Sequence, residues 1–140
     1  MKIKVENVAK YFYDKNQKLT DKQIQKLTYY AYAWYLTKYK TKLFDESPQA
    51  WIHGPVFMNL YKVLQNNELI NTTTECITEN KRVIELLEII YKVYGKYSGT
   101  RLEALTHSED PWIKARSGLE PTEKSRNIIK DEDIIAYYGA

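Results

Sequence analysis

Apolar residues recur with helical spacing along most of this chain, and the strongest pattern lies between residues 21 and 40. There, apolar and aromatic side chains cover most of the circumference of a helix and leave only a narrow polar strip. Thr20 and Gln23 match a capping box at its start. A helix that is apolar around most of its surface is buried on several sides, so the pattern predicts a central helix at 21–40.

Shorter helical patterns flank this segment. Proline suits the first turn of a helix, and Ser, Thr or Asp suits the position just before it. On these signals we expect helices that start near Val5, at Pro55 (about 55–65), after Thr78 (about 79–96), after Ser98 (through Leu105), at Pro111 and after Asp131 (132–138).

Two stretches do not keep the helical period. Residues 43–52 place apolar pairs on either side of a proline-containing turn, and residues 69–78 are polar and rich in threonine. We expect both to be short strands that pair in a small β-hairpin. The sequence therefore predicts a mainly α fold, a compact helical bundle around the central helix, with one domain spanning 1–140.

The segment AWIHGPV, residues 50–56, places a histidine beside a Gly-Pro step. It is either a catalytic loop around His53 or the corner between two elements. Gly54 frees the backbone and Pro55 presets the next helix, which favours the corner. We expect Trp51 to pack against the central helix.

Composition limits the class of protein. The chain has 140 residues, of which 44% are hydrophobic and 28% charged, as in globular domains. A single cysteine, Cys76, cannot form an internal disulfide and indicates a reducing compartment. No apolar run approaches a membrane span or a signal sequence. We therefore expect a cytoplasmic protein without membrane contact.

Catalytic and cofactor chemistry finds little support. The two histidines and Cys76 lack metal-ligand spacing, and no glycine-rich phosphate loop occurs. The sequence does not bring Cys76 to either histidine, and Ser98 and Ser108, which could meet His107, are more typical of helix caps. We expect no metal, no cofactor and no enzyme activity.

Charge and aromatic content suggest a partner surface. Residues 1–42 carry ten lysines against three acidic residues, and the chain has thirteen tyrosines. Tyrosines are common at protein interfaces, although most of those here also suit core packing. A lysine-rich helix also suits nucleic acid, but only four arginines are present to read bases. The residues selected for this surface are Lys22, Lys26, Tyr29, Tyr32, Tyr39 and Lys40.

Three segments together resemble a known family. IQKLTYYAYAWYL, LFDESPQAWIHGPVFMNLY and LEALTHSEDPWIKAR are similar, in order and spacing, to the Panacea or SocA-like antitoxin domain, also described as GepA-like and phage-associated. The resemblance extends from about Val5 to Tyr138. Gln49 departs from the family, in which an acidic residue is common before Ala-Trp. The family positions are Trp34, Trp51, Gly54, Pro55, Val56, Tyr61, Thr106, His107, Pro111, Trp112 and Arg116.

The resemblance implies a mainly helical antitoxin that neutralises a cognate toxin protein by direct binding. Its motif residues would be structural or would contact the toxin, and we expect Arg116 to stack on Trp112 or to bind a carboxylate. Two alternatives stay open: an adaptor that delivers the toxin to a cellular protease, and a nucleic-acid-binding module that uses the lysine-rich helix.

Overall fold

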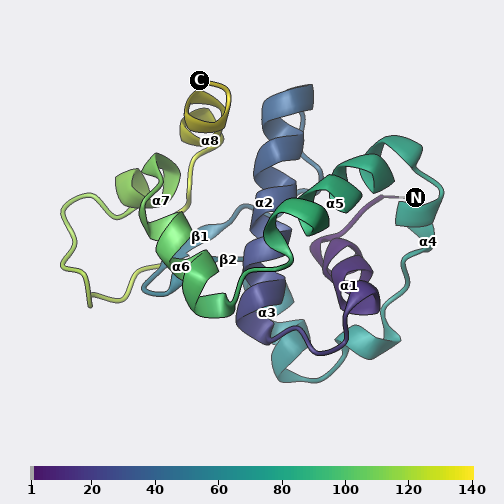
Figure 1. The fold of residues 1–140 in the computed structure, drawn as a ribbon. Coiled ribbons are helices and arrows are strands. Elements are labelled where there is room, and N and C mark those ends of the chain that lie inside the picture. The colour runs from purple at the N-terminus through teal and green to yellow at the C-terminus, as the bar shows by residue number, and fades with distance from the viewer. Residues whose placement is uncertain (1) are drawn as a thin grey trace.

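The computed structural model describes residues 2–140 and has a long helix at its centre (Figure 1). This helix, α2 (Asp21–Tyr39), contacts α1, α3, α5, α6, α8 and strand β2. The predicted capping box is present: the Thr20 hydroxyl accepts from the Gln23 amide at 3.2 Å, and the Gln23 side chain accepts from the Thr20 amide at 2.8 Å. The predicted central helix is therefore confirmed.

The remaining helices pack around α2. In Figure 1, α1, α4 and α5 lie on one side of it, and α6, α7 and α8 lie on the other. They are α1 (Val5–Lys15), α3 (Met58–Gln65), α4 (Glu75–Thr78), α5 (Lys81–Tyr94), α6 (Gly99–His107), α7 (Asp110–Ala115) and α8 (Asp131–Tyr138). The mainly helical fold class is confirmed. No helix within residues 2–140 is long and apolar enough to cross a membrane.

A small antiparallel hairpin is present, but one of its strands was assigned wrongly. β1 (Gln49–Trp51) pairs with β2 (Gly54–Val56), with Ala50 opposite Pro55. Residues 69–78, expected to be the second strand, form the 3-10 helix η1 (Leu69–Asn71) and α4 instead. Leu69, Cys76 and Ile77 are buried in the core, and the adjacent pair Cys76 and Ile77 does not follow the alternation of a strand with one buried face.

Other helix starts also differ from expectation. Asp131, expected just before the last helix, is the first residue of α8, and Lys130 is its N-cap. Pro55 lies in β2, where a residue without an N–H is tolerated in a short edge strand, and α3 begins only at Met58. α5 begins at Lys81, because the Asn80 side chain accepts from the Val83 amide and caps it, while Thr78 belongs to α4. Ser98 caps α6 as expected.

Candidate functional site

Hydrogen bonds from α7 and from the residue that follows it hold the β1–β2 hairpin in place. The Trp112 indole donates to the carbonyl of Trp51 at 2.9 Å, and the Arg116 guanidinium donates to the carbonyl of Ala50 at 2.9 Å. Arg116 also donates to the carbonyls of Glu120 and Glu123 and lies 5.3 Å from the Trp112 ring. The expected stacking is confirmed, but the acceptors of Arg116 are backbone carbonyls rather than a carboxylate.

Gly54 lets the hairpin approach the central helix closely. Its φ is +112°, a conformation that side-chain-bearing residues rarely adopt. A Cβ added there would lie 2.7 Å from Cε of Lys26 and 3.0 Å from the hydroxyl of Thr106. Glycine is therefore required at this corner both for its backbone conformation and for space.

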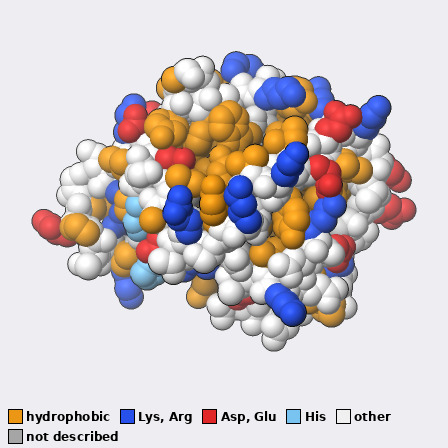
Figure 2. Space-filling model, viewed as in Figure 1, with side chains coloured by type: hydrophobic (Ala, Val, Ile, Leu, Met, Phe, Trp, Pro, Cys, Tyr) orange, Lys and Arg blue, Asp and Glu red, His pale blue; other side chains and the backbone are white. Residues whose placement is uncertain are grey.

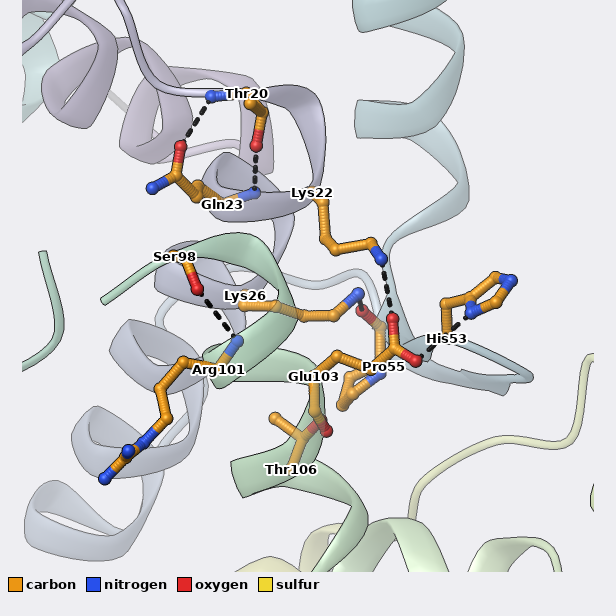
Figure 3. Close-up of polar contacts among 10 residues, drawn as sticks. All are labelled: Thr20, Lys22, Gln23, Lys26, His53, Pro55, Ser98, Arg101, Glu103 and Thr106. Atoms are coloured by element: carbon orange, nitrogen blue, oxygen red, sulfur yellow. Dashed lines mark hydrogen bonds and ion pairs between the residues drawn. The ribbon is translucent and has the colours of Figure 1, made fainter. Parts of the chain in front are cut away.

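Lys26 is buried, and its side chain extends to Pro55 at this corner (Figure 3). Its Nζ donates to the carbonyl of Pro55 at 3.2 Å. Burial lowers its pKa to about 7, and the nearby cation Lys22 adds to the effect, while Glu103 acts in the opposite direction. This lysine belongs to the packing of the fold and not to an exposed basic strip.

Next to Lys26, the carboxylate of Glu103 joins Lys22 to His53 (Figure 3). Lys22 Nζ lies 2.6 Å from Oε1 of Glu103, and His53 Nδ1 lies 3.2 Å from Oε2. Burial opposes ionisation of Glu103, but these two hydrogen bonds outweigh it and lower the pKa of its carboxyl group. Both oxygens are engaged, so the arrangement orders the turn and does not present a free base.

His107, the other histidine, is packed against α7. Its ring stacks on that of Trp112, with centroids 3.9 Å apart and planes 11° from parallel. Its Nε2 is buried without a hydrogen-bond partner among the described residues, and burial lowers the pKa of the ring. Within residues 2–140, no three His, Cys, Asp or Glu side chains are grouped as a metal site would require.

A groove of about 540 Å³ opens beside the hairpin, and we call it the hairpin groove. It is lined by Trp51, Ile52, His53, Met58, Tyr61, Lys124, Ser125 and Arg126. The rings of Trp51 and Tyr61 pack with centroids 5.1 Å apart, and the Gln49 side chain accepts from the Trp51 indole at 2.9 Å. The groove thus combines an oriented aromatic wall with a basic one.

The basic wall of this groove was missed in the sequence. Lys124 and Arg126 lie in a loop after α7, and this loop returns to the hairpin through backbone hydrogen bonds. Ala50 donates to the carbonyl of Asn127, and Ile129 donates to that of Pro48. No local pattern in this polar loop reveals which earlier segment it will contact.

The predicted tyrosine and lysine surface around α2 is not formed. Tyr29, Tyr32 and Lys26 are all buried. The hydroxyl of Tyr29 is hydrogen-bonded to that of Tyr138, and the hydroxyl of Tyr32 donates to Asp131. These side chains face the surrounding helices because α2 is enclosed on nearly all sides. The remaining members are separated: Lys22 is paired with Glu103, whereas half-buried Tyr39 and exposed Lys40 lie at the far end of α2.

The remaining family positions are mostly internal. Trp34 is half-buried and donates to the Tyr94 hydroxyl at 3.0 Å. Val56, Thr106 and Pro111 are buried, and the Thr106 hydroxyl donates to the carbonyl of Glu103 at 2.9 Å. Tyr61 is 39% exposed, which makes it the most accessible tyrosine or tryptophan among these positions.

A helical scaffold with one small hairpin and an aromatic, basic groove is suited to binding another macromolecule. Comparison with protein families shows which kind of scaffold it is: residues 24–113 match the family described as antitoxin SocA-like, Panacea domain. The chain therefore belongs to this family. The match runs from α2 into α7 and ends before Arg116. Comparisons with curated proteins and with solved structures gave no match.

Proposed function

We propose that this chain is an antitoxin that neutralises a cognate toxin protein by binding it directly, without a chemical step. Membership of the SocA-like, Panacea antitoxin family is the observation that carries the proposal. The arrangement of the polar side chains supports it, because Glu103 is fully engaged and His107 is stacked on Trp112. Neither is placed to activate a nucleophile.

The hairpin groove is the surface that we propose for the toxin. Trp, Tyr and Arg dominate the energetics of protein interfaces, and Trp51, Tyr61 and Arg126 meet in this groove. The Gln49 contact and the ring packing hold Trp51 in place before binding, which reduces the entropy lost on association. Lys124 and Arg126 add positive charge, so the groove suits an acidic segment of the toxin.

Nucleic-acid binding is less well supported. The basic strip on which it depended is interrupted, because Lys26 is buried and Lys22 is paired with Glu103. Delivery of the toxin to a cellular protease requires the same toxin contact and differs only in the fate of the bound toxin. The test therefore has to measure both toxin binding and toxin abundance.

Co-expression with the product of the neighbouring toxin gene tests the proposal. We expect growth to be restored, the two proteins to co-purify, and toxin abundance on an immunoblot to stay constant. Tyr61→Ala and Arg126→Glu should weaken the complex at least about tenfold, whereas Ile70→Ala, at another exposed position, should not. Toxicity without rescue would refute the antitoxin function. Rescue accompanied by loss of the toxin protein would instead establish delivery to a protease.

A further inference from the structure

A second groove lies between α2 and α5, and we call it the α2–α5 groove. Its volume is about 300 Å³. Figure 2 shows a continuous hydrophobic area over these two helices in the centre of the face, bordered by Lys and Arg side chains. The groove is lined by Trp34, Lys38, Leu86, Ile89, Ile90, Val93 and Tyr94. It shares none of these residues with the hairpin groove.

Helix α5 carries more apolar surface than its own packing uses. Leu86 and Ile90 lie on the side of α5 that packs on the core, yet Ile89 is 55% exposed and Val93 is 45% exposed. A single exposed apolar residue is ordinary, but these two are one helical turn apart and border a groove. A contiguous apolar patch of this kind marks an interaction site.

The floor of the groove is fixed before any partner arrives. The Trp34 indole donates to the Tyr94 hydroxyl at 3.0 Å, and the ring of Tyr94 stacks on that of Tyr30 at 4.0 Å. The Trp34 ring also packs on Tyr138 of α8, with centroids 5.2 Å apart. Binding at this surface therefore costs little side-chain ordering.

The walls of the groove suit a helix. Trp34 and Lys38 on α2 are four residues apart, as are Ile89 and Val93 on α5, so each wall repeats at one helical turn. An amphipathic helix places its apolar side chains at the same interval and lays them into such a groove.

The charge of the rim identifies the partner as acidic. Lys38 lines the groove, and Arg82, Lys92 and Lys96 are exposed on or next to α5. The same helix carries two exposed acids, Glu85 and Glu88, and Glu88 is already paired with Lys15 of α1 at 2.6 Å. None of these four cations forms an ion pair with an acidic group of residues 2–140. A second copy of the chain would bring like charges together, which disfavours self-association.

We propose that the α2–α5 groove binds an amphipathic helix with acidic flanks, contributed by a protein other than this chain. Apolar side chains of that helix lie between Ile89 and Trp34, and its carboxylates face Lys38 and Lys92. This interface goes beyond the toxin contact at the hairpin groove. The chain would then have two separate binding surfaces, the hairpin groove and the α2–α5 groove, and could hold one protein segment at each of them at the same time.

Designed peptides test the proposal on the full-length protein. The probe is a labelled peptide of roughly five helical turns with leucine at i, i+3, i+4 and i+7 and glutamate elsewhere. Its control has lysine in place of every glutamate. Fluorescence anisotropy measures binding at two salt concentrations. We expect the glutamate peptide to bind, more weakly at higher salt, and the lysine peptide to bind at least about tenfold more weakly.

Variants locate the binding. Ile89→Asp with Val93→Asp should reduce affinity for the glutamate peptide at least about tenfold, and Lys38→Glu with Lys92→Glu should reduce it as well. Ile70→Asp, at a 63% exposed isoleucine of η1, should not change it. If the aspartate pair alters the circular dichroism spectrum, and therefore the fold, the milder double variant Ile89→Ser with Val93→Ser replaces it in the binding measurement.

Several results would overturn the proposal. They are the absence of binding, equal binding of the two peptides, and binding that the groove variants leave unchanged. Dimers in solution that the Ile89→Asp change disperses would assign the groove to a second copy instead. None of these results involves the toxin, so the antitoxin function and this interface can fail independently.

Discussion

Nζ of Lys26 lies 3.2 Å from the carbonyl oxygen of Pro55, at a position where the amine is almost completely removed from water. A charged amine has three protons to donate, and the carbonyl of Pro55 accepts only one of them. Burial accordingly lowers the pKa of Lys26 to about 7. The contact ties the hairpin to the central helix at a cost that depends on pH.

Lys26 makes the free energy of unfolding rise with pH. Its pKa is about 7 in the folded chain and 10.5 when exposed, so the unfolded chain binds the extra proton between these values. Stability therefore increases as pH rises through 7, by about 2–3 kcal/mol from pH 6 to pH 9. Lys26→Met keeps the volume without the charge and should remove this increase. Urea denaturation at both pH values measures it.

Lys81→Met is the matched control, because Lys81 is exposed at the start of α5. It should retain the pH dependence of the unmodified protein. If the free energy of unfolding rose equally with pH in Lys26→Met and in the unmodified protein, Lys26 would not be the cause of the pH dependence. The measurements stop near pH 9. Burial raises the pKa values of Tyr29, Tyr30 and Tyr32 in the folded chain, so above that pH the tyrosines of the unfolded chain ionise first and the free energy of unfolding falls.

Gly54→Ala separates backbone strain from crowding at the same corner. The added methyl group would meet both an unfavourable φ of +112° and Cε of Lys26 at 2.7 Å. We expect a loss of about 3–5 kcal/mol. Gly118 also has a positive φ, +86°, but nothing within 4 Å of its added Cβ, so Gly118→Ala should cost only about 1–2 kcal/mol.

A double-mutant cycle identifies the crowding. In a Lys26→Ala background the Gly54→Ala change should cost less than it does alone, because the atom that it would strike is gone. Thermal unfolding of the four proteins provides the coupling free energy. Strict additivity would mean that Lys26 contributes nothing to the cost at Gly54, which would then arise from the backbone conformation and from the Thr106 hydroxyl.

Arg116→Lys tests the support beneath the hairpin. The planar guanidinium serves the carbonyls of Ala50, Glu120 and Glu123 together, which a single ammonium cannot reproduce. We expect a loss of about 2–4 kcal/mol and faster amide hydrogen exchange in residues 117–128. Arg101→Lys, at an exposed arginine of α6, should change neither. Unaltered exchange in 117–128 in the Arg116 variant would contradict this role.

Local signals predicted the elements that depend on local interactions. The capping box at Thr20 and the aromatic periodicity of residues 21–40 each act within a few turns, and the structure confirms the helix they predicted. The strand pairing was wrong, although the partner of residues 49–51 is local: residues 54–56 follow after a two-residue turn. Pro55 had been interpreted as the start of a helix, so the second strand was sought in residues 69–78. The close approach of Gly54 to Lys26 and Thr106, both far away in sequence, is visible only in the folded chain.

The site residues divide in the same way. Trp51 and Tyr61 belong to one motif and meet in the groove, whereas Lys124 and Arg126 enter it only through a returning loop. Tyr29 and Tyr32 were assigned to a surface because an aromatic helix face is compatible with core and interface alike. Only the arrangement of the surrounding helices, with Tyr138 and Asp131 as hydroxyl partners, shows that they are internal.

Glu109 tests how much of this buried tyrosine network depends on a charge. Tyr30 and Tyr138 both donate to one oxygen of Glu109, Oε1, at 2.9 and 2.7 Å. Glutamine retains a carbonyl oxygen with two lone pairs, so Glu109→Gln can accept both hydroxyls, whereas Glu109→Ala leaves both unsatisfied. We expect Glu109→Ala to cost about 2–5 kcal/mol and Glu109→Gln much less.

The same carboxyl group predicts a dependence on pH that opposes that of Lys26. Burial raises the pKa of Glu109, and the two tyrosine hydrogen bonds only partly offset this, so the folded chain holds the proton more tightly than the unfolded chain. Stability from this group is present below the ordinary glutamate pKa and is lost as pH rises through the raised value. Relative to the unmodified protein, Glu109→Gln should therefore become more stable as pH rises, which a comparison of pH 4 with pH 7 measures. Urea denaturation at those two pH values measures the change. Equal losses for Gln and Ala at both would show that the network requires the carboxylate itself.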